Sequence, residues 1–234
     1  SAATAGYRTE LYTSRYDPDA RTHPVVHTSL PDISRFIPYS LIRGYGGRKL
    51  IDKYLRAFAN GGIAHLWPSA PLSLYEELRR RGVPIIAEAV NTLMAAAKPL
   101  LDAAYDRHGI PSRHGITDER IADQNARFDL CSGIFTPSPA TEVALHGTPF
   151  ERRFIRSSYG TWLPPEPEAR RLKQREEVVT FLFVGLIGVR KGIPDLLAAW
   201  RDMPSNARLR LVGQIEPGFA DRFRDLLGQD NVSV

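Results

Sequence analysis

The sequence predicts an α/β protein of two Rossmann-like, doubly wound domains, on three observations. First, residues 181–184 form a continuous apolar run that ends at Gly185, and an amphipathic helix opens near Ile193. Such a run is typical of a parallel strand covered by helices on both faces. Second, residues 73–89 have the helix–Gly–Val–Pro–strand pattern of a doubly wound sheet. Third, residues 163–174 are rich in proline and charge, as a linker between domains would be.

The composition is that of a globular protein with a substantial core, because 43% of its 234 residues are apolar and 24% are charged. A single cysteine, Cys131, excludes a disulfide framework and a zinc–thiolate cluster, and it fits a cytoplasmic protein. No apolar run approaches the ~20 residues of a membrane-spanning helix. The net charge of +5 permits peripheral association with an anionic membrane face, but no motif supports nucleic-acid binding.

Residues 1–164 are expected to form the first domain. Alternating or continuous apolar residues predict strands at residues 10–14, 25–28, 63–67, 83–89, 133–136 and 154–158. Apolar residues along one side predict helices at residues 41–60, 73–81, 92–108, 117–130 and 141–146. Gly61 and Gly62 end the first helix, and Pro99 must either start the main part of the third helix or kink it.

Residues 165–234 are expected to begin the second domain. Strands are predicted at residues 180–184 and 209–213, and residues 231–234 have the pattern of a further strand. Two βα units are too few for a closed core. The chain also opens without a methionine. We therefore expect a protein that is incomplete at both ends, with only part of its second domain present.

The turn between residues 184 and 193 is a candidate anion site. Gly185 and Gly188 let the backbone turn tightly and let a ligand approach it. Arg190 and Lys191 stand just before Gly192, so two cations lie beside the free N–H groups of a helix N-terminus. That combination suits a phosphate or diphosphate. The alternative is an ordinary βαβ crossover whose two cations face solvent.

These residues resemble the donor-binding domain of glycosyltransferase family 4. The matching pattern is FVGLIGVRKGIPDLLAAW at residues 183–200, with Val-Gly and Lys-Gly-Ile, followed by LRLVG at residues 209–213. A weaker resemblance covers residues 132–165, where Pro-Ser, a helix and Gly-Thr-Pro occur in the family's order. One departure is Leu186, because many members carry arginine there; Arg190 can supply that charge.

The resemblance implies the GT-B fold, with two Rossmann-like domains facing a cleft. It implies a retaining transfer of a sugar from a nucleotide diphosphate to a hydroxyl of a glycan, lipid-linked or small-molecule acceptor. No cofactor or metal ion is implied, because Arg190 and Lys191 would act catalytically by stabilising the leaving diphosphate. The donor-binding residues would be Gly185, Gly188, Arg190, Lys191 and Gly213.

Acceptor-binding candidates lie near the strand ends of the first domain, where the resemblance is weak. They are His65, Glu88 and Asn91. A packed or hydrogen-bonded histidine is the alternative for His65. A charged Glu88 in a buried strand costs free energy unless it is paired. Many family members place a histidine near Asn91, so no family role carries over to that position.

Two other functions stay open at this point. One is another GT-B enzyme, such as a sugar-nucleotide epimerase or a storage-glucan synthase. The other is a non-catalytic Rossmann-like binding or scaffold protein, because a fold alone does not settle function. The family's paired glutamates, which hold the donor sugar, would lie beyond Val234 and would support the enzyme.

Overall fold

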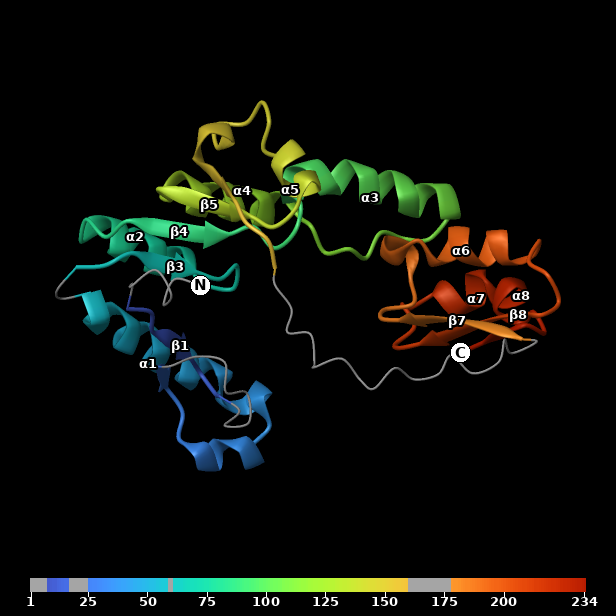
Figure 1. The fold of residues 1–234 in the computed structure, drawn as a ribbon, viewed down its shortest axis with the longest axis horizontal. Coiled ribbons are helices and arrows are strands. Elements are labelled where there is room, and N and C mark those ends of the chain that lie inside the picture. The colour runs from blue at the N-terminus through green and yellow to red at the C-terminus, as the bar shows by residue number, and fades with distance from the viewer. Residues whose placement is uncertain (1–7, 17–24, 59–60, 160–177) are drawn as a thin grey trace, which may run out of the picture. The chain divides into compact units, whose positions relative to one another are not determined.

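The computed structural model describes residues 8–16, 25–58, 61–159 and 178–234 (Figure 1). Strands alternate with helices along these residues, and the pairings β1–β2, β3–β4, β4–β5, β7–β8 and β8–β9 are all parallel. The α/β fold class is therefore confirmed. The predicted linker at residues 163–174, and the domain boundary placed after residue 164, lie outside the described residues.

The chain divides into two compact units. The first unit contains residues 1–88, 126–135 and 153–155. The second contains residues 89–125, 136–152 and 156–234. Segments from the middle of the sequence therefore belong to the same unit as the last strands, and each unit is described below by itself.

The first unit holds two parallel sheets. The smaller sheet pairs β1 (Leu11–Thr13) with β2 (Val26–Thr28). The larger sheet has the order β3-β4-β5-β6, with β3 at Ala64–Leu66, β4 at Ile85–Glu88, β5 at Gly133–Thr136 and β6 at Phe154–Arg156. Its helices are η1 (Asp32–Phe36), α1 (Tyr39–Ala57) and α2 (Leu72–Arg80). The 3₁₀ helix η1 replaces a segment that the sequence predicts as a loop.

Helix α2 shows how the sequence forms these elements. Leu74, Tyr75 and Leu78 repeat at helical spacing, and all three are buried on the side of α2 that contacts β4. Gly82 then takes a left-handed φ of 72°, which lets the chain reverse into β4. Ile85 and Ala87 alternate into the core from that strand. Local periodicity therefore determines which faces are buried.

Three helices from the middle of the sequence follow β4 and β5. They are α3 (Met94–His108), α4 (Asp118–Asp129) and α5 (Pro139–Val143), with η3 (Glu151–Arg153) before β6. Helix α3 begins at Met94 and contains Pro99, and it ends where Gly109 adopts a left-handed φ of 64°. The Thr117 hydroxyl accepts the Arg120 N–H at 3.3 Å and so caps α4, as the sequence predicts.

The second unit contains a parallel sheet of order β7-β8-β9. Its strands are β7 (Val179–Val184), β8 (Ala207–Val212) and β9 (Val232–Ser233). The helices beside it are η4 (Val189–Lys191), α6 (Ile193–Trp200), α7 (Phe219–Arg222) and α8 (Arg224–Leu227). Figure 1 shows α6, α7 and α8 on one side of the sheet. Buried side chains of α3, η4, α6, α7 and β8 form one apolar cluster: Tyr105, Ile110, Ile187, Val189, Ile193, Leu197, Trp200, Ala207, Leu209, Leu211, Phe219 and Phe223.

The prediction that β7 is buried on both faces is wrong for the described residues. Phe181, Leu182 and Val184 are 46%, 63% and 69% exposed. In the sheet order β7 lies at an edge. The helices cover only the face to which Leu209 and Leu211 of β8 point. The apolar run therefore identifies a strand correctly, while the number of its covered faces depends on which elements pack against it.

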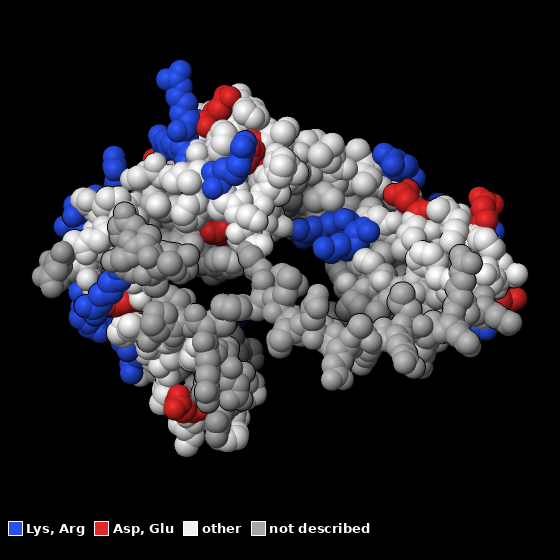
Figure 2. Space-filling model, in the orientation of Figure 1, with Lys and Arg blue, Asp and Glu red and all other residues white. Residues whose placement is uncertain are grey.

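Charged side chains of the described residues are scattered over the face drawn in Figure 2, with acidic and basic groups interspersed. Among the described residues, no helix is both long and apolar enough to cross a membrane. No group of three or more His, Cys, Asp or Glu side chains in that part of the chain could hold a metal ion.

Candidate functional site

The turn after β7 brings the predicted anion-binding residues together. The backbone leaves β7 at Gly185, and the turn η4 then carries Arg190 and Lys191 directly into Gly192 and α6. Gly192 has a left-handed φ of 70° and joins the end of η4 to the start of α6. Both cations are exposed. Two positive charges thus stand beside the N-terminus of an amphipathic helix, as the sequence predicts.

Neither cation is used by an ion pair within 4 Å among the described residues. Other basic groups of the protein differ in this respect: Lys98 is 2.7 Å from Asp102, and Arg156 is 2.7 Å from Glu142. Arg190 and Lys191 are therefore electrostatically available to an anionic ligand.

A second turn, after β8, lies against the first one. Ile187 N–H donates to the Gln214 carbonyl at 2.8 Å, and Glu216 N–H donates to the Ile187 carbonyl at 2.9 Å. These bonds continue the β7–β8 ladder past the ends of both strands. The carboxyl ends of two parallel strands therefore present their turns together, which is where doubly wound sheets bind ligands.

The space beside two of the predicted glycines is filled by the protein itself. A Cβ at Gly213 would lie 1.8 Å from the Gly185 carbonyl oxygen, and one at Gly188 would lie 2.5 Å from Glu216 Oε2. We expected these glycines to leave room for a ligand. The structure supplies a different reason for both, because the two turns approach too closely to admit a side chain.

Glu216 and Tyr105 belong to this site, and sequence reasoning missed them. The Glu216 side chain is 5% exposed. Its Oε2 accepts the Val189 N–H at 3.0 Å, and its Oε1 accepts a short hydrogen bond from the Tyr105 hydroxyl. The only signal in the sequence is a carboxylate between apolar residues and a Pro-Gly turn, which does not identify its partners.

Burial raises the pKa of the Tyr105 phenol, and the neighbouring Glu216 carboxylate raises that pKa further, although the charge of Arg190 lowers it. Tyr105 therefore stays protonated and donates its hydrogen bond at every pH at which the protein would normally be studied. The effect of Arg190 on Tyr105 also indicates that the cationic turn is electrostatically coupled to this buried pair.

The first unit brings His65 and Glu88 together. They lie on the neighbouring strands β3 and β4, and His65 Nε2 is 2.8 Å from Glu88 Oε2. The Glu88 side chain is 5% exposed, while that of His65 is 52% exposed and meets Phe135 edge-on, with ring centroids 5.3 Å apart. Glu88 is thus buried with a partner, as its position requires. Asn91 is exposed and belongs to the second unit.

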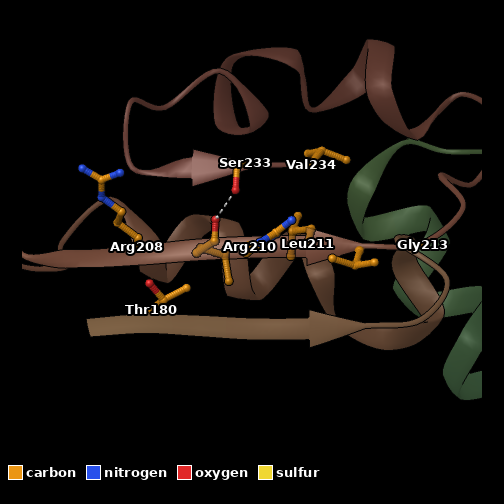
Figure 3. A pocket seen from close by; sticks show the side chains of 9 residues that line it. Thr180, Arg208, Arg210, Leu211, Gly213, Ser233 and Val234 are labelled. Carbon is orange, nitrogen blue, oxygen red and sulfur yellow. Dashed lines mark hydrogen bonds between the residues drawn. The ribbon is translucent and has the colours of Figure 1, made fainter. Parts of the chain in front are cut away.

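A hollow of about 620 Å³ lies over the uncovered face of the β7–β9 sheet (Figure 3). Thr180, Arg208, Arg210 and Gly213 line it, together with the end of β9, where Ser233 Oγ donates to the Leu209 carbonyl at 3.4 Å. Arg190 and Lys191 do not line it. The hollow is therefore separate from the cationic turn.

No family model and no curated protein matches the chain. Two solved structures are remotely similar to it. The apo form of the lipopolysaccharide outer core galactosyltransferase WaaB has 11% sequence identity and a TM-score of 0.44, over 89% of this chain and 52% of that one. Alr3699/HepE of Anabaena, in complex with UDP, has 14% identity and a TM-score of 0.48, over 89% and 54%. The chain spans about half the length of both.

Proposed function

We propose that this protein is a GT-B glycosyltransferase that takes a sugar from a nucleotide diphosphate and transfers it to a hydroxyl. The observation that carries the proposal is the turn after β7, where the exposed Arg190 and Lys191 lack an ion-pair partner among the described residues and precede helix α6. The match of residues 183–200 to the family 4 pattern supports the same function.

The proposed chemistry explains why cations are needed there. The bond between the anomeric carbon and the diphosphate oxygen breaks, and its electron pair leaves with the diphosphate. A new bond forms to the acceptor oxygen, which loses its proton. Arg190, Lys191 and the first N–H groups of α6 would stabilise the charge that develops on the diphosphate. We propose that they do so without a metal ion, and that the sugar keeps its anomeric configuration.

For the acceptor side we propose the pair His65 and Glu88, with Asn91 as a further contact. The buried Glu88 carboxylate holds one ring nitrogen of His65, and the exposed remainder of the ring is available to a hydroxyl. The acceptor class stays a glycan, a lipid-linked sugar or a small molecule. The buried free thiol of Cys131 supports a cytoplasmic setting, with peripheral contact to the inner membrane face if the acceptor is lipid-linked.

The test is calorimetric titration of the purified protein with UDP- and GDP-sugars in metal-free buffer. We expect binding of one nucleotide sugar, weakened about 10- to 100-fold in Lys191→Ala, because charge-assisted hydrogen bonds contribute roughly 1.5–3 kcal/mol. Arg201→Ala is the matched control, since Arg201 is equally exposed and directly follows α6. Binding of neither sugar, or equal effects of the two substitutions, would refute the donor site and favour a scaffold protein. Proton NMR of the product then tests retention.

A further inference from the structure

The turn η4 cannot cap its own N-terminus. Its N-cap residue is Gly188, which has no side chain, and η4 has no side-chain cap from that position. The Glu216 carboxylate occupies this place instead, since its Oε2 accepts the N–H of Val189, the first residue of η4. Gly188 and Glu216 are complementary, because a Cβ at residue 188 would collide with Glu216 Oε2 at 2.5 Å. A residue 27 positions away thus supplies the missing cap.

The same carboxylate also connects the turn to helix α3. Its second oxygen accepts the Tyr105 hydroxyl, and Tyr105 is 1% exposed in the apolar cluster. Helix α3 is held at this place by further contacts: Arg222 Nε donates to the His108 carbonyl at 2.9 Å, and His108 lies 3.9 Å from Asp195 at the start of α6. Tyr105 is therefore a firmly placed donor, and it directs the Glu216 carboxylate toward Val189.

A negative charge has been buried here without a basic partner. Among the described residues, no Lys, Arg or His nitrogen lies within 4 Å of the Glu216 carboxylate. By contrast the buried Glu142 is held by two hydrogen bonds from Arg156, at 2.8 and 2.7 Å. A buried carboxylate satisfied only by an N–H and a hydroxyl is costly. Its place behind the cationic turn therefore requires a reason beyond packing.

We propose that Glu216 is a positioning residue of the donor site, which fixes η4 so that Arg190 and Lys191 face the diphosphate, with Tyr105 orienting its carboxylate. The inference rests on the proposed function, because it gives the turn its ligand. Glu216 acts through the backbone of Val189 and does not touch the donor. Without its hydrogen bond, η4 loses its cap, and the two cations lose their shared orientation.

The test uses UDP and inorganic pyrophosphate as probes, with affinity measured by metal-free calorimetry. We expect Glu216→Ala to weaken binding of both about tenfold, which is the loss of one hydrogen bond to a charged group. Glu216→Gln should bind within about threefold of the original protein, because its amide oxygen still accepts the Val189 N–H. Glu142→Gln is the matched control for a buried carboxylate, and we expect it to leave both affinities unchanged.

Two further measurements separate positioning from a merely structural role. Hydrogen exchange of the Val189 amide should be faster in Glu216→Ala and should return toward its original rate in Glu216→Gln. Glu216→Asp keeps the charge but shortens the side chain by one methylene, so it should bind as weakly as Glu216→Ala. This variant serves as the test if Glu216→Ala does not fold.

The outcomes distinguish the two proposals. If Lys191→Ala loses the probes while Glu216→Ala and Glu216→Asp bind them normally, the positioning role is refuted and the donor site stands. If Glu216→Gln is impaired as much as Glu216→Ala, the charge rather than the cap matters, and the inference is also overturned. If the unmodified protein binds neither probe, the proposed function fails and the inference fails with it.

Discussion

The close approach of the two turns makes Gly213→Ala a sharp test of the structure. The new Cβ would lie 1.8 Å from the Gly185 carbonyl oxygen, whereas a carbon–oxygen contact needs about 3.3 Å. The β7 and β8 backbones would have to separate by about 1.5 Å at this point. That movement breaks the hydrogen bond from Gly185 N–H to the Val212 carbonyl, which is 2.9 Å long. Gly213 also has a φ of 149°, a conformation that alanine resists.

The expected cost can be assembled from these parts. The backbone conformation contributes about 1–3 kcal/mol and the lost hydrogen bond about 1 kcal/mol, so the free energy of unfolding should fall by roughly 3–4 kcal/mol. The thermal midpoint should fall by roughly 10 °C, at about 2–4 °C per kcal/mol for a chain of this size. Urea unfolding followed by tryptophan fluorescence measures the change, since Trp200 is 3% exposed in the core of this unit.

Gly147→Ala provides the control for this prediction. Gly147 also has a left-handed φ, of 73°, but a Cβ added there would meet no atom within 4 Å. Alanine at that position should therefore cost only the conformational term, about 1–2 kcal/mol. If Gly213→Ala destabilises the protein no more than Gly147→Ala does, the contact between the two turns is wrong.

Three further predictions follow from burial, open space and charge. Leu197→Ala should lower the free energy of unfolding by about 2–5 kcal/mol in urea denaturation, because Leu197 is fully buried in the apolar cluster; a loss below about 1 kcal/mol would contradict that packing. Gly44→Ala should raise stability by roughly 0.5–1 kcal/mol, since Gly44 lies inside α1 with no atom within 4 Å of a new Cβ; a lower urea midpoint would show that the position is not free helix. Hydrogen bonds from Lys98 and His114 lower the pKa of Asp102 to about 2, from an ordinary value of 3.8. Its contribution to stability is therefore complete above the ordinary value and is lost as the pH falls toward 2, so between pH 5 and pH 2.5 Asp102→Asn should lose less stability than the original protein, and equal losses would exclude the ion pair.

The regular elements follow closely from local pattern. The strand predicted at residues 133–136 is β5 without change, and the predicted helix at residues 73–81 is α2, displaced by one residue. Each succeeds because its apolar spacing and its Gly or Pro boundary lie within a few residues of one another. The segment at residues 31–39 was harder, because the short 3₁₀ helix η1 has an exposed apolar sequence and no periodic buried face.

The candidate site was predictable only in part. Arg190 and Lys191 were found because they adjoin a glycine turn and a helix start, all within one stretch of sequence. The pairing of His65 with Glu88 was not predicted, although both residues were candidates, because it depends on the register of β3 against β4. Tyr105 and Glu216 are 111 positions apart, and neither carries a local signal that points to the other.

The sequence by itself determined the alternation of strands and helices, the turn with its two cations, and the resemblance that suggests a sugar-nucleotide ligand. These features are encoded by neighbouring residues, whose spacing sets both secondary structure and the buried face. Only the tertiary structure decided that β7 is open on one face, that Gly213 and Gly188 are required by Gly185 and Glu216, and that Glu216 caps η4. Such contacts join residues that are distant in the chain, so they arise from how the elements pack rather than from any local pattern.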